Sequence, residues 1–439
     1  MTLDYRKSAR NFSLVSSVGK EFISNLVFAK DNRKSLENCD KIGIVGGELF
    51  NKGAQAMTFT VVDQLSKRFP EKDVYLFSSR DYRRPAKEKS QYTFEILPWG
   101  PEIQLSALAP NLHSVNSTEH ETATVQNVRN VLSSCTFLID INGYALSSQR
   151  GFSTSFGYVS NIIIAKNYGL PMYVLPQSVG PFDYATPKQF VLNPLLQTYL
   201  SYPEVICARE TAGVEEISRY TRNNVRHEFD IVLQNRDYDL DNIYEADPDI
   251  KRWDVAPDAV GIVPNSNVFE RGNSEEIYDL YERVVEKLLE NHRSVYILRH
   301  SVEDLQYCEN IKRRFKDEEK VELVGEELNA IELEYIIDQF DYMIGSRYHS
   351  LIHAYKNGTP VLAIGWAVKY RELLQEFNQT QYFFEGRDRI DTQEFLDAVS
   401  LMDSKYTTES ERITERREEI LERDLFQELF SDSVASSEN

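Results

Sequence analysis

Cysteine is scarce in this sequence, and its four copies lie far apart. Cys39, Cys135, Cys207 and Cys308 form neither a CxxC pair nor a cysteine–histidine pattern with the spacing of metal ligands. Isolated cysteines of this kind argue against a zinc site and against a disulfide framework. We therefore expect four reduced thiols and no bound metal.

Long apolar runs are also missing. No stretch approaches the roughly 18 apolar residues that a membrane-spanning helix needs. Charges interrupt the apolar residues of positions 1–40, which lack the apolar centre of a secretory signal. We expect residues 1–40 to form a helical extension packed on the first domain, with a helix lying on a membrane surface as the alternative. The pattern favours a cytoplasmic protein and leaves open a peripheral position at the inner face of the membrane.

Positive charge is in deficit. The chain has 49 Lys and Arg residues against 69 Asp and Glu residues, a formal charge of -20. A surface this acidic repels phosphate backbones, so we expect no nucleic-acid partner. An anionic small substrate would need a local basic pocket. With 439 residues and 41% hydrophobic content, the chain is long and apolar enough for two domain cores.

Short runs of Val, Ile and Leu alternate with helical patterns along most of the chain. Continuous apolar runs indicate strands covered on both faces, and strand–helix alternation indicates parallel sheets. The predicted strands are residues 41–46, 73–79, 94–98, 136–141, 172–175 and 205–208 in the first half, and 259–264, 294–299, 321–324, 342–345 and 360–364 in the second.

A polar passage rich in Pro and Asp, RDYDLDNIYEADPDIKRWDVAPDA, separates the two halves. We place the domain boundary near residue 250 and predict an α/β fold of two doubly wound, Rossmann-like domains that face each other across a cleft. The first domain spans residues 41–250 and the second 251–400. Residues 401–439 are highly charged and predict a solvated helix followed by a disordered end.

The most informative segment is GSRYH, residues 345–349, at the end of a predicted strand. In open α/β sheets ligands bind beyond the carboxyl ends of the strands. Ser346 is a suitable cap for a helix over residues 348–357, which would place Arg347 and His349 in its first turn. A helix N-terminus favours an anion, arginine offers a planar fork for carboxylate or phosphate, and histidine moves protons near neutral pH. A buried Arg–acid pair with a satisfied histidine is the structural alternative.

Polar residues follow several other predicted strands. The candidate binding residues at these strand ends are Asn51, Asn142, Gln177, Arg209, Asn265 and His300. Asn51 opens a helix after a Gly-Gly turn, and Asn142 and Gln177 lie in polar turns that suit sugar hydroxyls or are plain structural turns. A surface salt bridge is the alternative for Arg209. His353 lies four residues after His349 and could form a metal pair with it. Because no acidic partner stands at a suitable spacing, we assign His353 a packing or supporting role.

Several of these blocks together resemble the polysaccharide pyruvyl transferase family. Along the chain the blocks are NKGAQAM, PQSVGP, ARE, DYMIGSRYHSLIHA, NGTPVLAI and the Lys369–Tyr370 pair. They occur in the same order as in that family. The resemblance runs over residues 41–374. Two departures stand out: the turn after residue 139 reads DINGY rather than a run of glycines, and Tyr348 occupies a position where a small or aliphatic residue is common.

The resemblance implies a glycosyltransferase-B-like fold and transfer of a pyruvyl group from phosphoenolpyruvate to two hydroxyls of a sugar, which forms a cyclic ketal in a polysaccharide such as an exopolysaccharide. It implies that Arg347, His349 and Arg209 form the phosphoenolpyruvate site, with no further cofactor. We expect His349 to act as acid/base, the two arginines to clamp carboxylate and phosphate, Tyr348 to lie in the donor site, and Lys369 to contact phosphate. A lipid-linked and a soluble acceptor both remain open, as does the oligomeric state.

Two other functions remain open from the sequence. The first is a nucleotide-sugar-dependent glycosyltransferase of the same fold, in which Arg347 would hold the diphosphate. The second is a non-catalytic subunit of a polysaccharide-assembly complex.

Overall fold

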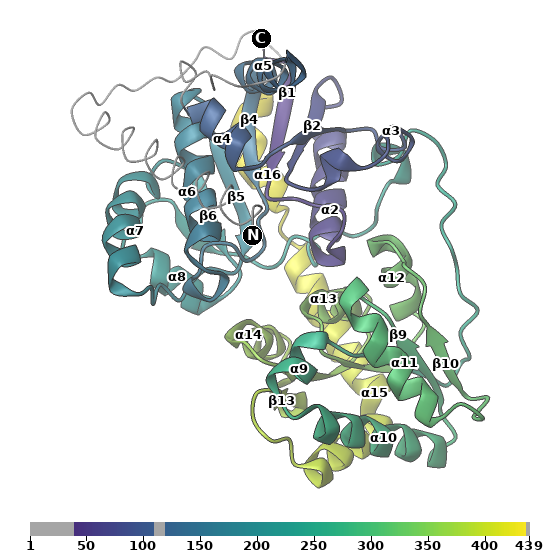
Figure 1. Ribbon diagram of the computed structural model, residues 1–439. Coiled ribbons are helices and arrows are strands. Elements are labelled where there is room, and N and C mark those ends of the chain that lie inside the picture. Colours follow the sequence, from purple (N-terminus) through teal and green to yellow (C-terminus); the bar gives the residue numbers. More distant parts are fainter. Residues whose placement is uncertain (1–38, 109–118, 436–439) are drawn as a thin grey trace.

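The computed structural model describes residues 39–108 and 119–435, which form two Rossmann-like domains (Figure 1). The predicted helical extension at residues 1–40 therefore lies almost wholly outside the described residues. The N-terminal domain contains a seven-stranded parallel sheet in the order β3-β2-β1-β4-β5-β6-β7. Its strands are β1 (Lys41–Val45), β2 (Asp73–Ser78), β3 (Glu95–Pro98), β4 (Cys135–Asp140), β5 (Met172–Gln177), β6 (Val205–Ala208) and β7 (Val225–His227).

The C-terminal domain repeats this plan with a six-stranded parallel sheet. The strand order is β10-β9-β8-β11-β12-β13. Its strands are β8 (Ala259–Val263), β9 (Ser294–Leu298), β10 (Val321–Val324), β11 (Tyr342–Gly345), β12 (Val361–Gly365) and β13 (Phe383–Glu385). In both sheets the strand order reverses beside the first strand of the domain, which is the point where doubly wound folds bind ligands.

Helices cover both faces of each sheet, as crossover connections between parallel strands require (Figure 1). Those of the N-terminal domain are α2 (Lys52–Arg68), α3 (Ala86–Lys89), α4 (Pro101–Leu108), α5 (Glu119–Ser134), α6 (Phe152–Asn167), α7 (Thr186–Tyr199) and α8 (Thr211–Ile217). The second half contributes α9 (Ser266–Arg271), α10 (Ser274–Glu290), α11 (Leu305–Arg314), α12 (Ala330–Ile337), α13 (Tyr348–Lys356), α14 (Val368–Glu376), α15 (Thr392–Leu421) and α16 (Leu425–Ala435).

All eleven predicted strands are present, with ends that differ from the prediction by at most two residues. Two further strands, β7 and β13, were not predicted. Each has only three residues, lies at a sheet edge and is only partly buried. A short, half-covered strand has too few apolar residues to produce the run that marks the central strands.

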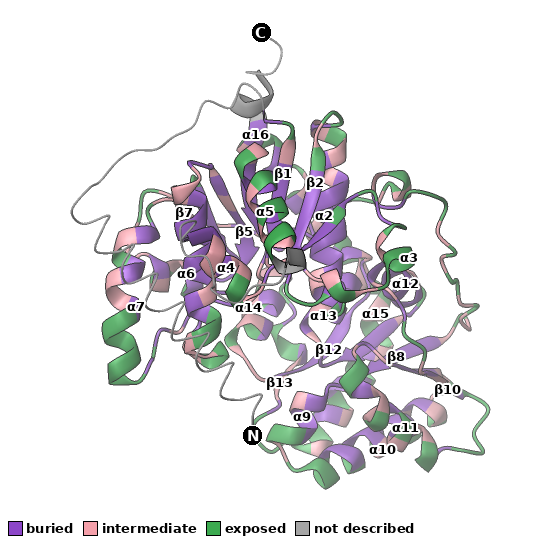
Figure 2. Cartoon of the chain, turned by 45° about the horizontal axis from the view of Figure 1, so that its top comes forward, coloured by how far each residue is buried: buried purple, intermediate pink, exposed green. Residues whose placement is uncertain are grey.

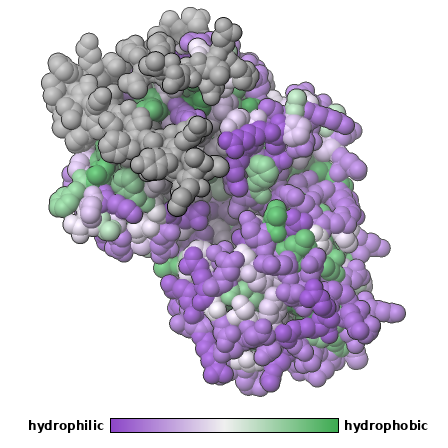
Figure 3. All heavy atoms as spheres, viewed as in Figure 1, coloured by the Kyte–Doolittle hydropathy of each residue, from purple (hydrophilic) through white to green (hydrophobic). Residues whose placement is uncertain are grey.

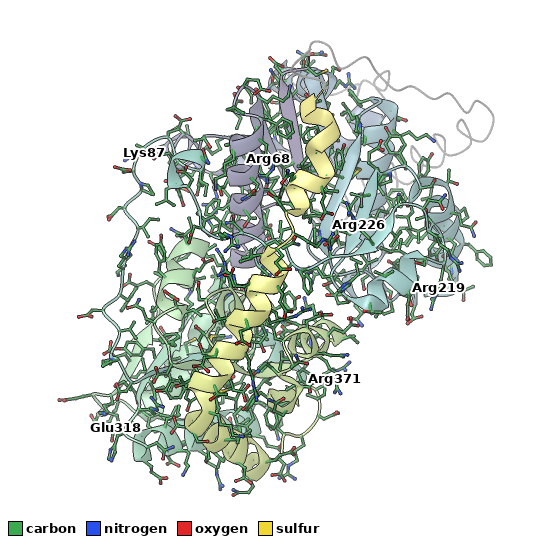
Figure 4. The ribbon with its side chains drawn as sticks, turned by 180° about the vertical axis from the view of Figure 1, so that it is seen from behind. Arg68, Lys87, Arg219, Arg226, Glu318 and Arg371 are labelled. Atoms are coloured by element: carbon green, nitrogen blue, oxygen red, sulfur yellow. The ribbon has the colours of Figure 1, made fainter. Side chains whose placement is uncertain are left out.

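The charged C-terminal segment joins the two domains. Helix α15 begins on the C-terminal sheet and runs toward the N-terminal domain, where α16 packs (Figure 4). Phe430 of α16 stacks on Phe137 of β4 with ring centroids 5.0 Å apart, and Arg68 and Arg226, on either side of α16, pair with Asp424 and Glu428. The residues expected to form a disordered end are helical as far as Ala435, and residues 436–439 lie outside the described part.

The central strands of both sheets are buried (Figure 2), whereas the visible face of the C-terminal domain is mostly hydrophilic (Figure 3). All four cysteines are free and buried, as expected. Among the described helices none is both long and apolar enough to cross a bilayer.

Candidate active site

A cleft of about 720 Å³ lies between the domains. Its walls come from the turns after β1 and β4 on one side and after β8 and β11 on the other. These are the strand-order reversal points of the two sheets, so the fold brings two ligand-binding edges face to face. The cleft is lined by Asn51, Asn142, Arg209, Asn265, His300, Arg347, Tyr348, His349 and Lys369, nine of the ten predicted site residues.

The corner between β11 and α13 differs from the prediction in one detail. Ser346 does not cap α13, because its backbone N–H still bonds to Val263 of the neighbouring strand and its hydroxyl meets that of Tyr281 at 3.1 Å. Arg347 occupies the cap position instead, and its side chain makes no capping hydrogen bond. The positive end of α13 therefore faces the cleft without a side-chain acceptor of its own, which suits an anionic ligand.

Arg347 is fixed by a buried acid. Its guanidinium forms a two-point pair with Asp304, in which Nε donates at 2.8 Å, and Nη2 also reaches the Ser266 hydroxyl. Burial raises the pKa of Asp304, and Arg347 opposes that rise. The Arg–acid pair that was the structural alternative is thus present, but Arg347 also lines the cleft. The pair holds the guanidinium in a single orientation.

Arg209 reaches the same place from the N-terminal domain. Its guanidinium pairs with Asp230, donates to the carbonyl of Gly143 at 2.9 Å and to the Ser178 hydroxyl at 2.8 Å. Its flat face covers the ring of Tyr348 at 4.8 Å, so the aromatic residue at this position gives the cation a stacking partner across the domain boundary.

His349 lies against the first turn of α2. A methyl group added to Gly53 would fall 2.0 Å from the Nδ1 atom of His349, so only glycine allows the imidazole to sit there. Its Nε2 atom is buried without a hydrogen-bond partner among the described residues, and the Asp230 carboxylate is 3.8 Å away. Burial and the nearby Arg209 hold the pKa of His349 well below its usual value. The imidazole is therefore neutral near pH 7.

Lys369 carries the third positive group. Its ammonium lies among the rings of Tyr348, Tyr144 and Tyr370, at 4.7, 5.1 and 5.8 Å from their centroids. Burial and the charge on Arg209 lower the pKa of Lys369 to about 7. A lysine so placed can gain or lose a proton at physiological pH.

Two predicted residues and His353 lie behind this group. Asn265 donates to the Ser346 carbonyl at 2.7 Å and caps α9, which steadies the loop that carries Arg347. The Nε2 atom of His300 is buried and has no hydrogen-bond partner in the part of the chain that the structure describes. Burial together with His353 lowers the pKa of His300 well below its usual value. His353 is fully buried and contacts Glu334 at 3.2 Å. No group of three or more potential metal ligands occurs among the described residues, and the His353 ring lies beside that of His300, with centroids 6.4 Å apart.

The remaining predicted residues divide between the cleft wall and the interior. Asn51 caps α2 by accepting from the N–H of Ala54. Asn142 lines the cleft but donates to the buried Asp140 carboxylate. Gln177 is fully buried, also donates to Asp140, and is not brought to the cleft.

Sequence reasoning missed several residues of the site. Asp230 and Asp304 were not predicted, because their arginine partners are distant in the sequence. Asp304 could have been found, since it follows His300 in the same strand-end loop. Arg80 and Arg150 line the rim and follow β2 and β4, so the strand-end argument could have found them. No feature of the neighbouring sequence singles out Gly53. Its importance comes from its contact with His349 of the other domain.

Two Rossmann-like domains with facing strand ends place the protein in the glycosyltransferase-B fold class. Solved structures of low sequence identity share this fold. UDP-GlcNAc 2-epimerase from Neisseria meningitidis, bound to UDP-GlcNAc, has a TM-score of 0.52 at 11% identity, covering 90% of this chain and 100% of its own. UGT71G1 of Medicago truncatula, complexed with UDP-glucose, has a TM-score of 0.51 at 11% identity, with 87% and 94% covered.

The family assignment rests on the sequence match. Residues 51–367 match the polysaccharide pyruvyl transferase family, and this range includes the GSRYH corner, Arg209 and the α2 start. The chain belongs to the polysaccharide pyruvyl transferase family.

Proposed function

We propose that the protein transfers the pyruvyl group of phosphoenolpyruvate to two hydroxyls of a sugar and releases inorganic phosphate. The observation that carries this proposal is the meeting of Arg209, Arg347 and Lys369 around a neutral His349 at the start of α13. Phosphoenolpyruvate is small and carries several negative charges. An arginine guanidinium group on each side and a helix N-terminus are positive groups suited to bind such a ligand.

The chemistry divides between two proton-transfer groups. Ketal formation begins with a proton added to the methylene carbon C3, which makes C2 electrophilic. Lys369 is the donor in this scheme, because a pKa of about 7 keeps a protonated fraction that readily gives up its proton. The neutral His349 then takes the proton of the first sugar hydroxyl as its oxygen bonds to C2. The expected acid/base role of His349 thus narrows to that of a base.

The second half of the reaction closes the ring. The second hydroxyl oxygen bonds to C2, the bond from C2 to the phosphate oxygen breaks, and the electron pair leaves with phosphate, which takes up the remaining proton. Arg209 and Arg347 stabilise the charge on the leaving group throughout. A sugar with two hydroxyls close enough to span one carbon is the acceptor, on a lipid carrier or in a soluble oligosaccharide.

The proposal is tested by replacing His349 with alanine. His349→Ala should bind phosphoenolpyruvate with nearly unchanged affinity, measured by calorimetry, because Arg209 and Arg347 remain in place. Its phosphate release in the presence of a sugar acceptor should fall roughly 100-fold, the effect of losing a general base. His292→Ala, an exposed histidine outside the cleft, serves as the control. Wild-type turnover in His349→Ala would remove this residue from the mechanism.

A further inference from the structure

The ammonium group of Lys369 has aromatic rings where an enclosed lysine ordinarily has an acid. Lys369 makes no hydrogen bond or ion pair within residues 39–108 and 119–435, the described part of the chain. Its ammonium lies 4.7 Å from the ring centroid of Tyr348 and 5.1 Å from that of Tyr144. The face of an aromatic ring attracts a cation at distances of up to about 6 Å. The rings therefore take the place of a carboxylate partner for the Lys369 charge.

The two closest rings come from opposite domains. Tyr144 lies in the turn after β4, where its hydroxyl donates to Gln149 at 2.9 Å, and Tyr348 is the first residue of α13. Tyr348 also faces Arg209, whose guanidinium carbon lies 4.8 Å from the ring centroid. Cations and rings thus alternate along a row of four side chains that begins and ends in the N-terminal domain and passes through the C-terminal domain between.

Both tyrosines stand where the sequence departs from the pattern of its family. Tyr144 ends the DINGY turn, which replaces a run of glycines, and Tyr348 occupies a position where a small or aliphatic residue is common. Glycine and aliphatic side chains offer no ring to a cation. The fold brings the two departures to the same lysine, so they act together on one charge.

The charges around Lys369 explain what such a pair of rings contributes. Burial and the neighbouring Arg209 lower the pKa of Lys369 to about 7, and Arg150 acts in the same direction. Glu210 and Asp230 oppose them without pairing with the ammonium. A ring that contacts a cation stabilises only the charged form of the lysine, so each tyrosine favours retention of the proton.

We propose that Tyr144 and Tyr348 are positioning residues for Lys369, which hold its ammonium charged and in place among the cationic groups of the cleft. The rings themselves take no part in bond making. The catalytic consequence rests on the proposed function, because Lys369 supplies the proton for C3 of phosphoenolpyruvate there. The effect of the two rings on the charge of Lys369 does not depend on the substrate.

The test replaces each tyrosine in turn with leucine and with phenylalanine. Leucine removes the ring, whereas phenylalanine removes only the hydroxyl and is the matched control. NMR of protein labelled with carbon-13 at the lysine Cε atoms follows the titration, and the Lys369 signal is the one missing from Lys369→Arg. Each leucine variant should lower the Lys369 midpoint by roughly one pH unit, the size of a desolvated cation–π contact. Each phenylalanine variant should keep the wild-type midpoint.

The pH dependence of phosphate release separates positioning from a structural defect. In Tyr144→Leu the alkaline fall of kcat/KM for phosphoenolpyruvate should begin roughly one pH unit lower than in Tyr144→Phe, while the two variants should approach each other on the acid side of that fall. A structural defect would instead lower kcat/KM equally at every pH. Tyr144 gives the cleaner comparison, because Tyr348 also stacks on Arg209.

Equal Lys369 midpoints in the leucine and phenylalanine variants would overturn the assignment, and if one leucine variant does not fold, the other position decides it. Failure of the proposed function has a different appearance. In that case the midpoint shifts in the leucine variants, yet phosphoenolpyruvate neither binds nor releases phosphate.

Discussion

At the residue scale, each cationic group of the site depends on a partner that fixes its position. Asp304 holds Arg347, Asp230 holds Arg209, and three tyrosine rings surround Lys369. The arginines stay charged at every physiological pH, whereas Lys369 does not. Protonation of Lys369 is therefore the variable that links this site to pH.

The first prediction concerns the pH profile. Because burial lowers the pKa of Lys369 to about 7, its charged form is lost as pH rises through that value. We expect kcat/KM for phosphoenolpyruvate to fall on the alkaline side of about pH 7. Lys369→Arg, which stays charged, should remove this fall and keep donor affinity, while kcat drops roughly 100-fold because arginine does not donate its proton. A Lys369→Arg enzyme with wild-type kcat would assign Lys369 to charge alone.

At the element scale, the site depends on the contact between the first turn of α2 and the first turn of α13. Gly53 on α2 leaves room for His349 on α13, and the adjacent Lys52 pairs with Glu327 of the C-terminal domain at 3.0 Å. Gln55 of α2 also accepts from the N–H of Ala330 at the start of α12, at 2.9 Å. One helix of the N-terminal domain thus sets the position of the imidazole.

The second prediction concerns Gly53. A methyl group at this position overlaps the His349 ring, so Gly53→Ala should lower kcat by about 10- to 100-fold and destabilise the protein by about 1–3 kcal/mol, as overpacking does. In the His349→Ala background the overlap is absent, and Gly53→Ala should then cost little stability. A double-mutant cycle of thermal unfolding measures this coupling. Additive losses would show that Gly53 and His349 act independently.

The elements themselves were largely predictable from the sequence. The central strands of both sheets are fully buried, and their apolar runs mark them clearly. The end of each strand could be located well enough to identify Arg209, Arg347 and His349. The roles of the buried acids could not be predicted. Asp230 and Asp304 pair with Arg209 and Arg347, which are distant in the sequence and meet them only in the folded chain. Gln177 lies away from the cleft and donates to the buried Asp140, because an amide at a strand end can bind either a ligand or a buried carboxylate.

At the scale of the whole molecule, two kinds of contact hold the domains together: the C-terminal segment, and side chains of each domain that accept hydrogen bonds from the start of a helix in the other. Gln55 contacts the start of α12 from one side, and Glu372 of α14 accepts from the N–H of Thr211 at the start of α8 from the other. Helix α15 then carries the chain back, and α16 inserts Phe430 among Phe69, Phe137 and Tyr173. The cleft between the two sheets is thus bounded by elements that fix the arrangement of both domains.

The third prediction tests this connection. Phe430 is fully buried, so Phe430→Ala should lower the stability of the protein by about 3–5 kcal/mol, the cost of removing a large buried side chain. Phe190→Ala is the matched control, because Phe190 is 77% exposed and should contribute little. Calorimetric unfolding of the two variants measures the difference. Equal melting temperatures would mean that α16 does not stabilise the N-terminal domain.

The central claim is that the cationic group in the cleft activates phosphoenolpyruvate for transfer of its pyruvyl group to a sugar. The most direct measurement is NMR of the product formed from phosphoenolpyruvate labelled with carbon-13 at C2, together with a sugar acceptor. The account predicts that the label appears in a ketal carbon of the sugar, with one phosphate released per ketal, and that His349→Ala lowers the rate of both roughly 100-fold. Sugar transfer from a UDP-sugar with release of UDP, and no ketal from phosphoenolpyruvate, would contradict it.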